Sequence, residues 1–143
     1  MTVLKPQNGS YRIVFLNEIG MKFFDFELFK DSFQIRQIFD AMNKKMFVNM
    51  LVEDYRLILD YPNTTQFEVF LDGETGEKVH KPKGKRDFYF YNSETGIPSK
   101  KIRYSTFRKI IDLSYSDYKD SNPYKIKIQH QNIKFNMQMS FIK

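Results

Sequence analysis

The sequence predicts a mainly β, α+β fold, in which a curved antiparallel sheet or half-barrel carries one amphipathic helix across its concave face. Residues 133–141 alternate strictly between apolar and polar side chains, as a strand with one buried face does. Aromatic residues, all of them Phe or Tyr, make up 17% of the chain and favour strands. Only residues 41–59 show the apolar spacing of a long helix. Because a one-sided strand belongs to an antiparallel sheet, its apolar face must be covered by the helix, a second sheet or a ligand.

The N-terminal part predicts three strands joined by turns. We expect strands at residues 11–16, 21–29 and 33–39. The first turn contains Gly20, for which we expect a special backbone angle, and residues 30–32 form the second turn.

The helix predicted over residues 41–59 has defined ends. Asp40 is the expected N-cap, because its carboxylate can accept hydrogen bonds from the free amides of the first turn. Pro62 ends the helix, since the residue before a proline, here Tyr61, is disfavoured in helical geometry. The predicted apolar face consists of Phe47, Met50, Leu51, Tyr55 and Ile58.

The C-terminal part returns to strands, which are expected to meander. The predicted strands are residues 67–71, 88–91, 97–104, 107–115, 124–128 and 133–141. Residues 78–86 are expected to form a mobile basic loop, and residues 117–123 a polar connection. Glu-Thr-Gly follows an aromatic strand twice, so we expect the same hairpin turn twice, with Gly76 and Gly96 at positive φ.

The composition limits the class of protein. The 143 residues fit a single domain, 1–143. A net charge of +6 suits anionic partners such as nucleic acid, acidic lipid headgroups or acidic proteins, and also suits a plain Lys-rich surface. The absence of cysteine excludes disulfides, thiolate metal sites and a cysteine nucleophile. No apolar run is long enough to span a membrane.

The titratable residues form no catalytic or metal-binding motif. His80 and His130 lie on different elements, without a neighbouring acid at ligand spacing. Glu53-Asp54 is expected at a solvated helix edge, and Asp25 and Glu27 share a strand face without a base or nucleophile motif. Phosphate-binding glycine motifs are absent. We therefore predict a protein that is not an enzyme and that uses no metal and no cofactor.

A basic stretch precedes a run of aromatic residues, and together they form the basic–aromatic segment, residues 78–91. Its cations are Lys78, Lys81, Lys83, Lys85 and Arg86. Basic groups beside exposed aromatic rings can bind single-stranded nucleic acid. The same cations can attract anionic lipid headgroups, or they can belong to a solvated loop beside a core strand.

Methionines recur on both predicted apolar surfaces, and methionine adapts to varied apolar guests. They line the helix at every fourth position from Met42, and they occur on the last strand. An apolar ligand between helix and sheet would be contacted by Met46, Phe47, Met50, Leu51, Tyr55, Phe135, Met137 and Met139. The alternative is that these side chains fill an ordinary core.

The order of elements resembles the lipoprotein-localisation factor fold (LolA/LolB-like), and also small bacterial lipoproteins of unassigned role. The resemblance lies in the strand pair 11–16 and 20–26 and in the closing segments 123–128 and 133–141. It implies an unclosed antiparallel half-barrel whose concave apolar face is covered by helical elements and carries acyl chains. Family members have more than one helical cover and an exposed apolar loop that enters lipid, and the sequence shows no clear counterpart of either.

The leading expectation is a non-catalytic envelope protein that binds a lipid or lipoprotein acyl chain in an apolar cavity between helix and sheet. We expect it to be a periplasmic monomer, anchored at the outer membrane through a residue upstream of this sequence. The alternatives are a nucleic-acid or acidic-partner binding module using residues 78–91, and a structural protein with a filled core. Nucleic acid is the less favoured partner.

Overall fold

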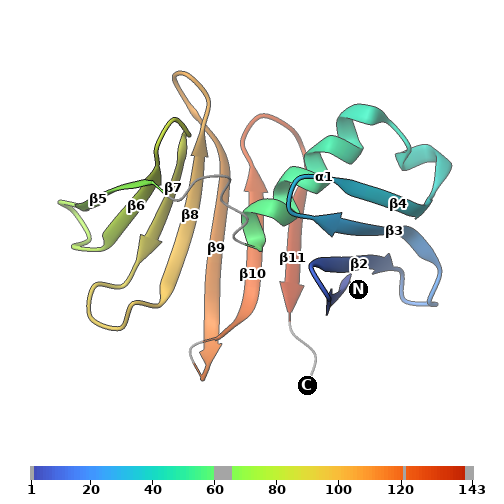
Figure 1. Ribbon diagram of the computed structural model, residues 1–143, viewed down its shortest axis with the longest axis horizontal. Coiled ribbons are helices and arrows are strands. Elements are labelled where there is room, and N and C mark those ends of the chain that lie inside the picture. Colours follow the sequence, from blue (N-terminus) through green and yellow to red (C-terminus); the bar gives the residue numbers. More distant parts are fainter. Residues whose placement is uncertain (1, 60–65, 121, 141–143) are drawn as a thin grey trace. The chain divides into compact units, whose positions relative to one another are not determined.

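The computed structural model describes residues 2–59, 66–120 and 122–140, whose elements are labelled in Figure 1. The chain divides into two compact units, which we call the N-terminal unit (Met1–Tyr61) and the C-terminal unit (Pro62–Lys143). Each unit is described by itself, and the expectation of one domain over residues 1–143 stays a prediction.

The N-terminal unit is an antiparallel meander of four strands followed by the helix. The strand order is β1-β2-β3-β4. The elements are β1 (Thr2–Gln7), β2 (Ser10–Leu16), β3 (Lys22–Phe29), β4 (Phe33–Ile38), the 3-10 turn η1 (Asp40–Met42) and α1 (Lys45–Ile58). Three of these strands agree with the sequence prediction, whereas β1 was not predicted.

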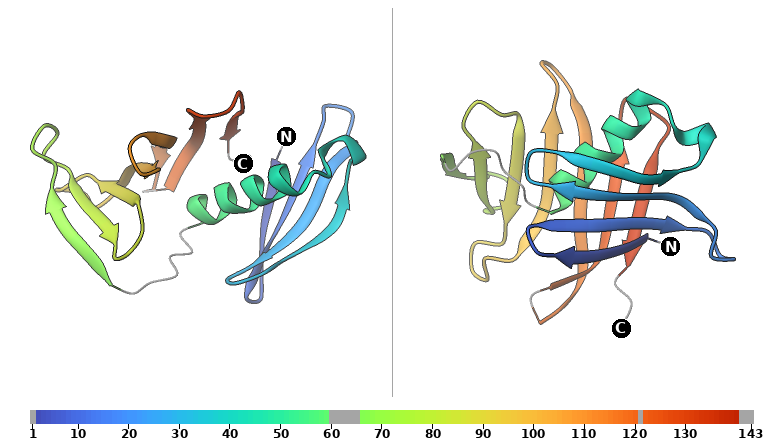
Figure 2. Two further views of the ribbon diagram at one scale, coloured as in Figure 1. Left: turned by 90° about the horizontal axis from the view of Figure 1, so that it is seen from above. Right: turned by 45° about the vertical axis from the view of Figure 1, so that its right-hand side comes forward.

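Helix α1 runs alongside the four-stranded sheet, as Figure 2 shows. Its buried stripe has the expected helical spacing and comprises Val48, Leu51, Val52 and Tyr55. The ring of Tyr55 meets two β3 rings edge-on, with centroid distances of 6.3 Å to Phe24 and 5.6 Å to Phe26. These contacts fix the helix to the face of β3 that carries Phe24 and Phe26.

The N-terminus of α1 differs from the prediction. Asp40 begins the 3-10 turn η1, and the N-cap of α1 is Lys44, which makes no side-chain capping bond. The predicted cap at Asp40 is therefore wrong, because the short turn separates it from the helix. Tyr61 and Pro62, which predicted the end of the helix, lie outside the described residues. Glu53 is exposed as expected, but Asp54 is completely buried, so the expected solvated edge is wrong for Asp54.

The C-terminal unit is an open antiparallel sheet of seven strands, in the order β11-β10-β9-β8-β7-β6-β5. It curves along its length from β5 to β11 (Figure 2). The strands are β5 (Phe67–Leu71), β6 (Lys78–Pro82), β7 (Asp87–Tyr91), β8 (Pro98–Tyr104), β9 (Lys109–Lys119), β10 (Asn122–His130) and β11 (Asn136–Ser140).

Two segments expected to be irregular are strands. Residues 78–82 form β6, which pairs with β5 on one side and β7 on the other, so the mobile loop predicted for 78–86 is wrong. Val79 of β6 is buried although its neighbours include two lysines. The charge of this stretch concealed the strand pattern in the sequence. The connection predicted for 117–123 is also wrong, because β9 and β10 extend into it and pair.

The two Glu-Thr-Gly tips are the same turn, as predicted. Gly76 and Gly96 have φ angles of +70° and +69°, and each donates its N–H to the carbonyl four residues earlier, that of Asp72 or Asn92. In each tip the side-chain oxygen of that residue also accepts a backbone hydrogen bond, at 3.0 Å, from the residue two positions later. The shared Glu-Thr-Gly sequence therefore corresponds to the same turn geometry and the same hydrogen bonds in both tips.

The predicted mainly β, α+β class is confirmed. The strands are antiparallel throughout, and the described residues contain one α-helix. They form two open sheets instead of one, of four and seven strands, and the contacts of Tyr55 lie on the smaller sheet.

Candidate functional site

The helical residues predicted to contact a ligand differ widely in burial. Leu51 and Tyr55 are buried in the core of the N-terminal unit. Phe47 and Met50 are half-buried, and Met46 is 82% exposed. Two of the five are therefore packing residues, and Met46 lies mostly in solvent.

The predicted strand residues lie in the C-terminal unit. Met137 and Met139 are on β11, where they stand opposite Ile128 and Ile126 of β10. Both methionines are half-buried, whereas both isoleucines are buried. Phe135 precedes β11 and is half-buried. The predicted site residues thus form one group in each unit, and Phe141 lies outside the described residues.

A row of side chains crosses five strands of the seven-stranded sheet on one face. In register order it comprises Tyr89, Lys101, Leu113, Ile128 and Met137. We call this set, together with Ile126 and Met139, the apolar face. Leu113 and Ile128 are fully buried, and the half-buried methionines occupy the β11 edge.

Lys101 is a cation within this row and is only 1% exposed. Its Nζ lies 5.3 Å from the ring centroid of Tyr89 and 5.4 Å from that of Tyr115. Such cation–π contacts favour the charged amine in a poorly solvated position. The sequence alternation places Lys101 on a face, but it does not show that two tyrosines flank the side chain.

Two adjacent turns form one end of the seven-stranded sheet. The turn between β6 and β7 (83–86) and the turn between β8 and β9 (105–108) together are called the basic tip. The backbone N–H of Tyr104 donates to the Arg86 carbonyl at 2.9 Å, and Arg86 Nη1 donates to Thr106 Oγ1 at 2.7 Å. Phe107 is 96% exposed there. The two segments contain no acidic residue, and their exposed cations are Lys83, Lys85, Arg86 and Arg108.

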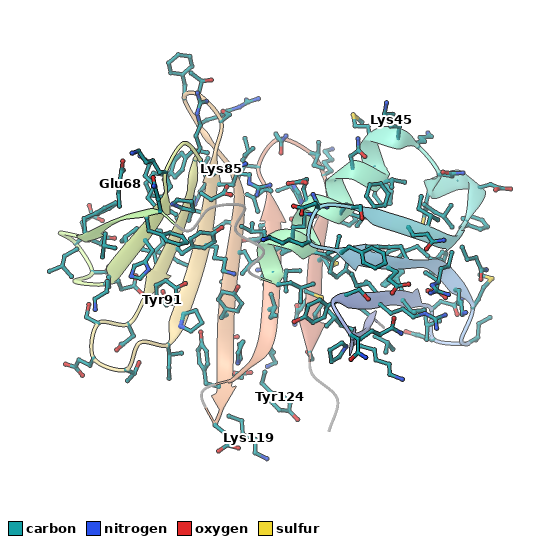
Figure 3. All side chains as sticks on the ribbon, in the orientation of Figure 1. Lys45, Glu68, Lys85, Tyr91, Lys119 and Tyr124 are labelled. Atoms are coloured by element: carbon teal, nitrogen blue, oxygen red, sulfur yellow. The ribbon has the colours of Figure 1, made fainter. Side chains whose placement is uncertain are left out.

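The basic tip lies at a defined end of the sheet. Figure 3 labels Lys85 near the end from which the β8–β9 turn projects, and Lys119 at the opposite end. Sequence reasoning missed Phe107, which it assigned to the start of a strand. The sequence did offer a signal for an exposed ring: Phe107 lies between the polar Thr106 and Arg108, four positions before Ile111, the first buried residue of β9.

The five cations of the basic–aromatic segment do not form one group. Lys78 and Lys81 are on β6, and Lys81 pairs with Glu68 at 2.9 Å. Lys83, Lys85 and Arg86 belong to the basic tip.

The aromatic rings of this segment contact other side chains of the sheet. Phe88 packs edge-on against Phe70 and Tyr104, and Phe90 lies beneath Lys100 Nζ at 4.3 Å. Because their faces and edges are occupied in this way, these rings offer little surface on which a nucleic-acid base could stack.

Two carboxylates on β3 are held by cations. Arg12 Nε and Nη2 donate to Asp25 at 3.0 and 2.7 Å, and Arg36 Nη2 donates to Glu27 at 2.6 Å. The hydrogen bond from Arg12 lowers the pKa of Asp25, and that from Arg36, followed by the Ser10 hydroxyl, lowers the pKa of Glu27. A general acid at neutral pH needs the opposite shift, so these two carboxylates are unsuited to that role.

A shallow pocket of about 450 Å³ lies between the β3–β4 turn and α1. Both signs of charge line it, from Asp31, Glu53 and Arg56. Arg56 reaches Glu53 at 3.5 Å and the Ser32 carbonyl at 3.4 Å, so its guanidinium contacts the walls of the pocket.

Among residues 2–59, 66–120 and 122–140, no group of three or more His, Asp or Glu side chains is placed to hold a metal ion. None of the helical residues described forms a helix long and apolar enough to cross a bilayer. Comparison with protein-family models, with curated proteins and with solved structures finds no match to this chain.

Proposed function

We propose that this protein is a non-catalytic, peripheral lipid-binding protein of the cell envelope. Its basic tip contacts an anionic membrane surface, and the half-buried Met137 and Met139 at the β11 edge of its apolar face accept an acyl chain of a lipid or lipoprotein. The observation that carries the proposal is Phe107, an exposed aromatic side chain surrounded by cations at the end of a sheet.

The chemistry of the basic tip suits a membrane surface. Each Lys or Arg close to an anionic leaflet contributes about 1 kcal/mol. Burying a Phe side chain in the interface contributes about 2 kcal/mol. Four cations and one ring together support reversible attachment, which weakens with salt because the charges are exposed.

The apolar face suits an acyl chain. Its methionines are flexible enough to follow a chain of variable length, and the buried isoleucines beside them keep that surface dry. Lys101 adds a positive charge to the same row, which favours a lipid with an anionic headgroup over a neutral one.

Membrane contact is tested by flotation of the purified protein with vesicles. Vesicles of phosphatidylcholine mixed with phosphatidylglycerol are expected to carry the protein at low salt, and vesicles of phosphatidylcholine alone to carry much less. Phe107→Ser is expected to weaken binding about thirtyfold, since it removes about 2 kcal/mol of apolar burial. The matched control is Ile19→Ser, because Ile19 is 86% exposed in a turn without cations.

The contribution of charge to membrane binding is tested with a second variant and its own control. The double variant Lys83→Glu/Lys85→Glu changes the basic tip, and the control Lys119→Glu changes the opposite end of the sheet (Figure 3). Only the first is expected to abolish the preference for anionic vesicles. Equal binding to both kinds of vesicle, or equal effects of both variants, contradicts the proposed membrane contact.

Acyl-chain binding is tested with a fluorescent fatty acid below its micelle concentration, and by native mass spectrometry of the purified protein. Met137→Lys is expected to reduce the affinity for the fatty acid at least tenfold, because it places a charge on the apolar face. Gln138→Lys is the control, since the neighbouring position on β11 projects to the other face. Equal losses in the two variants, or no bound fatty acid in the wild type, contradict this part of the proposal.

A further inference from the structure

The seven-stranded sheet ends at β5, whose outer edge carries a defined set of backbone groups. Lys83 donates its N–H to the Gln66 carbonyl at 3.0 Å, and Asp72 donates its N–H to the Glu77 carbonyl at 2.8 Å. Because hydrogen-bonded pairs alternate along an antiparallel ladder, Glu68 and Phe70 also direct their backbone groups towards β6. The N–H and C=O groups of the three remaining residues, Phe67, Val69 and Leu71, therefore point outward.

The side chains of the same three residues are apolar and exposed on one face. Phe67 is 39%, Val69 57% and Leu71 67% exposed. Pro82, which stands opposite Phe67 on β6, has no N–H and is consistent with this register. The β5 edge thus offers, at the same positions, apolar side chains and backbone polar groups that point away from β6.

The other three edge strands carry residues that discourage strand pairing. Edge β1 contains Lys5 and Pro6, and β4 contains Arg36 between two glutamines. Edge β11 alternates methionine with Asn, Gln and Ser. In contrast, β5 contains no Pro and no Lys, and its one charge, Glu68, is paired with Lys81.

We propose that β5 is a homodimer interface, in which it pairs antiparallel with β5 of a second copy about a two-fold axis at Val69. In this register Val69 faces Val69 of the second copy, and Phe67 faces Leu71. All three facing pairs are of the hydrogen-bonded kind, so the outward backbone groups of both copies are satisfied.

A second copy fits this edge because β5 is symmetric about Val69. Phe67 and Leu71 are the apolar residues at equal distances from it, and Glu68 faces Phe70 of the other copy, so no like charges stand directly opposite. The contact is isologous and closes with two copies, which leaves no unpaired β5 edge for a third copy. From the sequence we expect a monomer. The alternation of β5 alone does not show which backbone groups point away from β6.

The dimer is tested by analytical ultracentrifugation over a range of protein concentration, at low and high salt. Wild type is expected to shift from monomer to dimer mass as concentration rises, more readily at high salt because both copies carry +6. Val69→Lys is expected to remain monomeric, since it places two like charges at the axis. Val3→Lys, on edge β1, is expected to behave as wild type.

Cross-linking tests the register of the β5–β5 pairing, and it does not depend on whether the Val69→Lys variant folds. The chain has no cysteine, so Val69→Cys introduces one thiol next to its counterpart in the second copy. It is expected to form a covalent dimer on mild oxidation. Leu71→Cys is expected not to, because the two thiols would stand about 13 Å apart along the strands, at about 3.4 Å per residue.

Three results would overturn the inference. These are a wild-type protein that stays monomeric at every concentration and salt, a dimer that Val69→Lys leaves intact, and assembly beyond two copies. None of them bears on the basic tip or the apolar face, so the inference and the proposed function can fail separately.

Discussion

Arg12 on β2 holds Asp25 on β3 through two parallel hydrogen bonds, Nε to Oδ1 at 3.0 Å and Nη2 to Oδ2 at 2.7 Å. Lys22 adds a third contact to Oδ2 at 3.1 Å. The Asp25 side chain is almost completely covered by these cations, which are themselves part-exposed. The two hydrogen bonds therefore join β2 to β3 on the face of the sheet that carries Arg12 and Asp25.

The first prediction concerns the pH dependence of stability. The hydrogen bond from Arg12 lowers the pKa of Asp25 in the folded state. Its stabilising contribution is present above the unfolded-state pKa of about 4 and is lost as the pH falls through the lower folded-state pKa. Arg12→Ala is expected to raise the pKa of Asp25, measured by NMR titration, and to lower Tm by about 3 °C at pH 7. Lys5→Ala should change neither quantity.

The second prediction concerns the core beneath α1. Tyr55 is fully buried between Phe24 and Phe26, so Tyr55→Ala should cost about 3–5 kcal/mol of unfolding free energy. Met46→Ala on the same helix should change it by less than about 0.5 kcal/mol, because Met46 is mostly exposed. Urea denaturation of both variants measures the difference, and similar losses would contradict the packing described.

The third prediction concerns the same tyrosine at high pH. Burial raises the pKa of Tyr55 above its ordinary value. The unfolding free energy that comes from burying its neutral phenol is fully present below about pH 10. It is lost as the pH rises towards the folded-state pKa. Ultraviolet titration should therefore show Tyr55 ionising after the exposed tyrosines, and Tyr55→Phe should remove that late step.

The fourth prediction uses two glycines of one hairpin tip. Gly76 has a φ of +70°, whereas Gly73 lies outside the left-handed region, and a Cβ added at either would meet open space. Gly76→Ala should destabilise the protein by about 1 kcal/mol through backbone strain alone. Gly73→Ala should be neutral or slightly stabilising. Thermal unfolding of the two variants gives the comparison, and equal effects would show that the tip turn is not as described.

The fifth prediction concerns Arg103, which forks onto Asp87 with distances of 2.6 and 3.1 Å. Lysine keeps the charge but loses the planar fork, so Arg103→Lys should reduce the unfolding free energy by about 1 kcal/mol. The exposed Arg108, substituted in the same way, should show no measurable change in a chemical unfolding curve.

Sequence patterns predicted strands whose apolar residues are continuous or alternate, such as β2 and β10, and the paired tips at Gly76 and Gly96. They failed where charge or proline concealed the pattern. Lys78–Pro82 has the composition of a loop but pairs on both sides, and Pro6 concealed β1. Periodicity shows which residues share a face, but it does not show where one sheet ends and the next begins.

The candidate site was less predictable than the fold, for a similar reason. The recurrence of methionines grouped Met46 with Leu51 as ligand contacts, whereas the exposed fraction of a side chain depends on the neighbouring strands. The basic tip and the flanking of Lys101 by Tyr89 and Tyr115 arise from residues distant in sequence. Such neighbours are fixed only when the register of several strands is known.

The repeated tip has a consequence for how this sheet can change in length. Asp72–Gly76 and Asn92–Gly96 close two hairpins in the same way, and the Ser93 hydroxyl donates to the Gly76 carbonyl, which joins one tip to the next. A hairpin with such a tip is therefore a repeated unit of this sheet, and the Ser93 hydrogen bond attaches the second unit to the first. Inserting or deleting one such unit would lengthen or shorten the sheet by two strands, while every remaining residue kept its face.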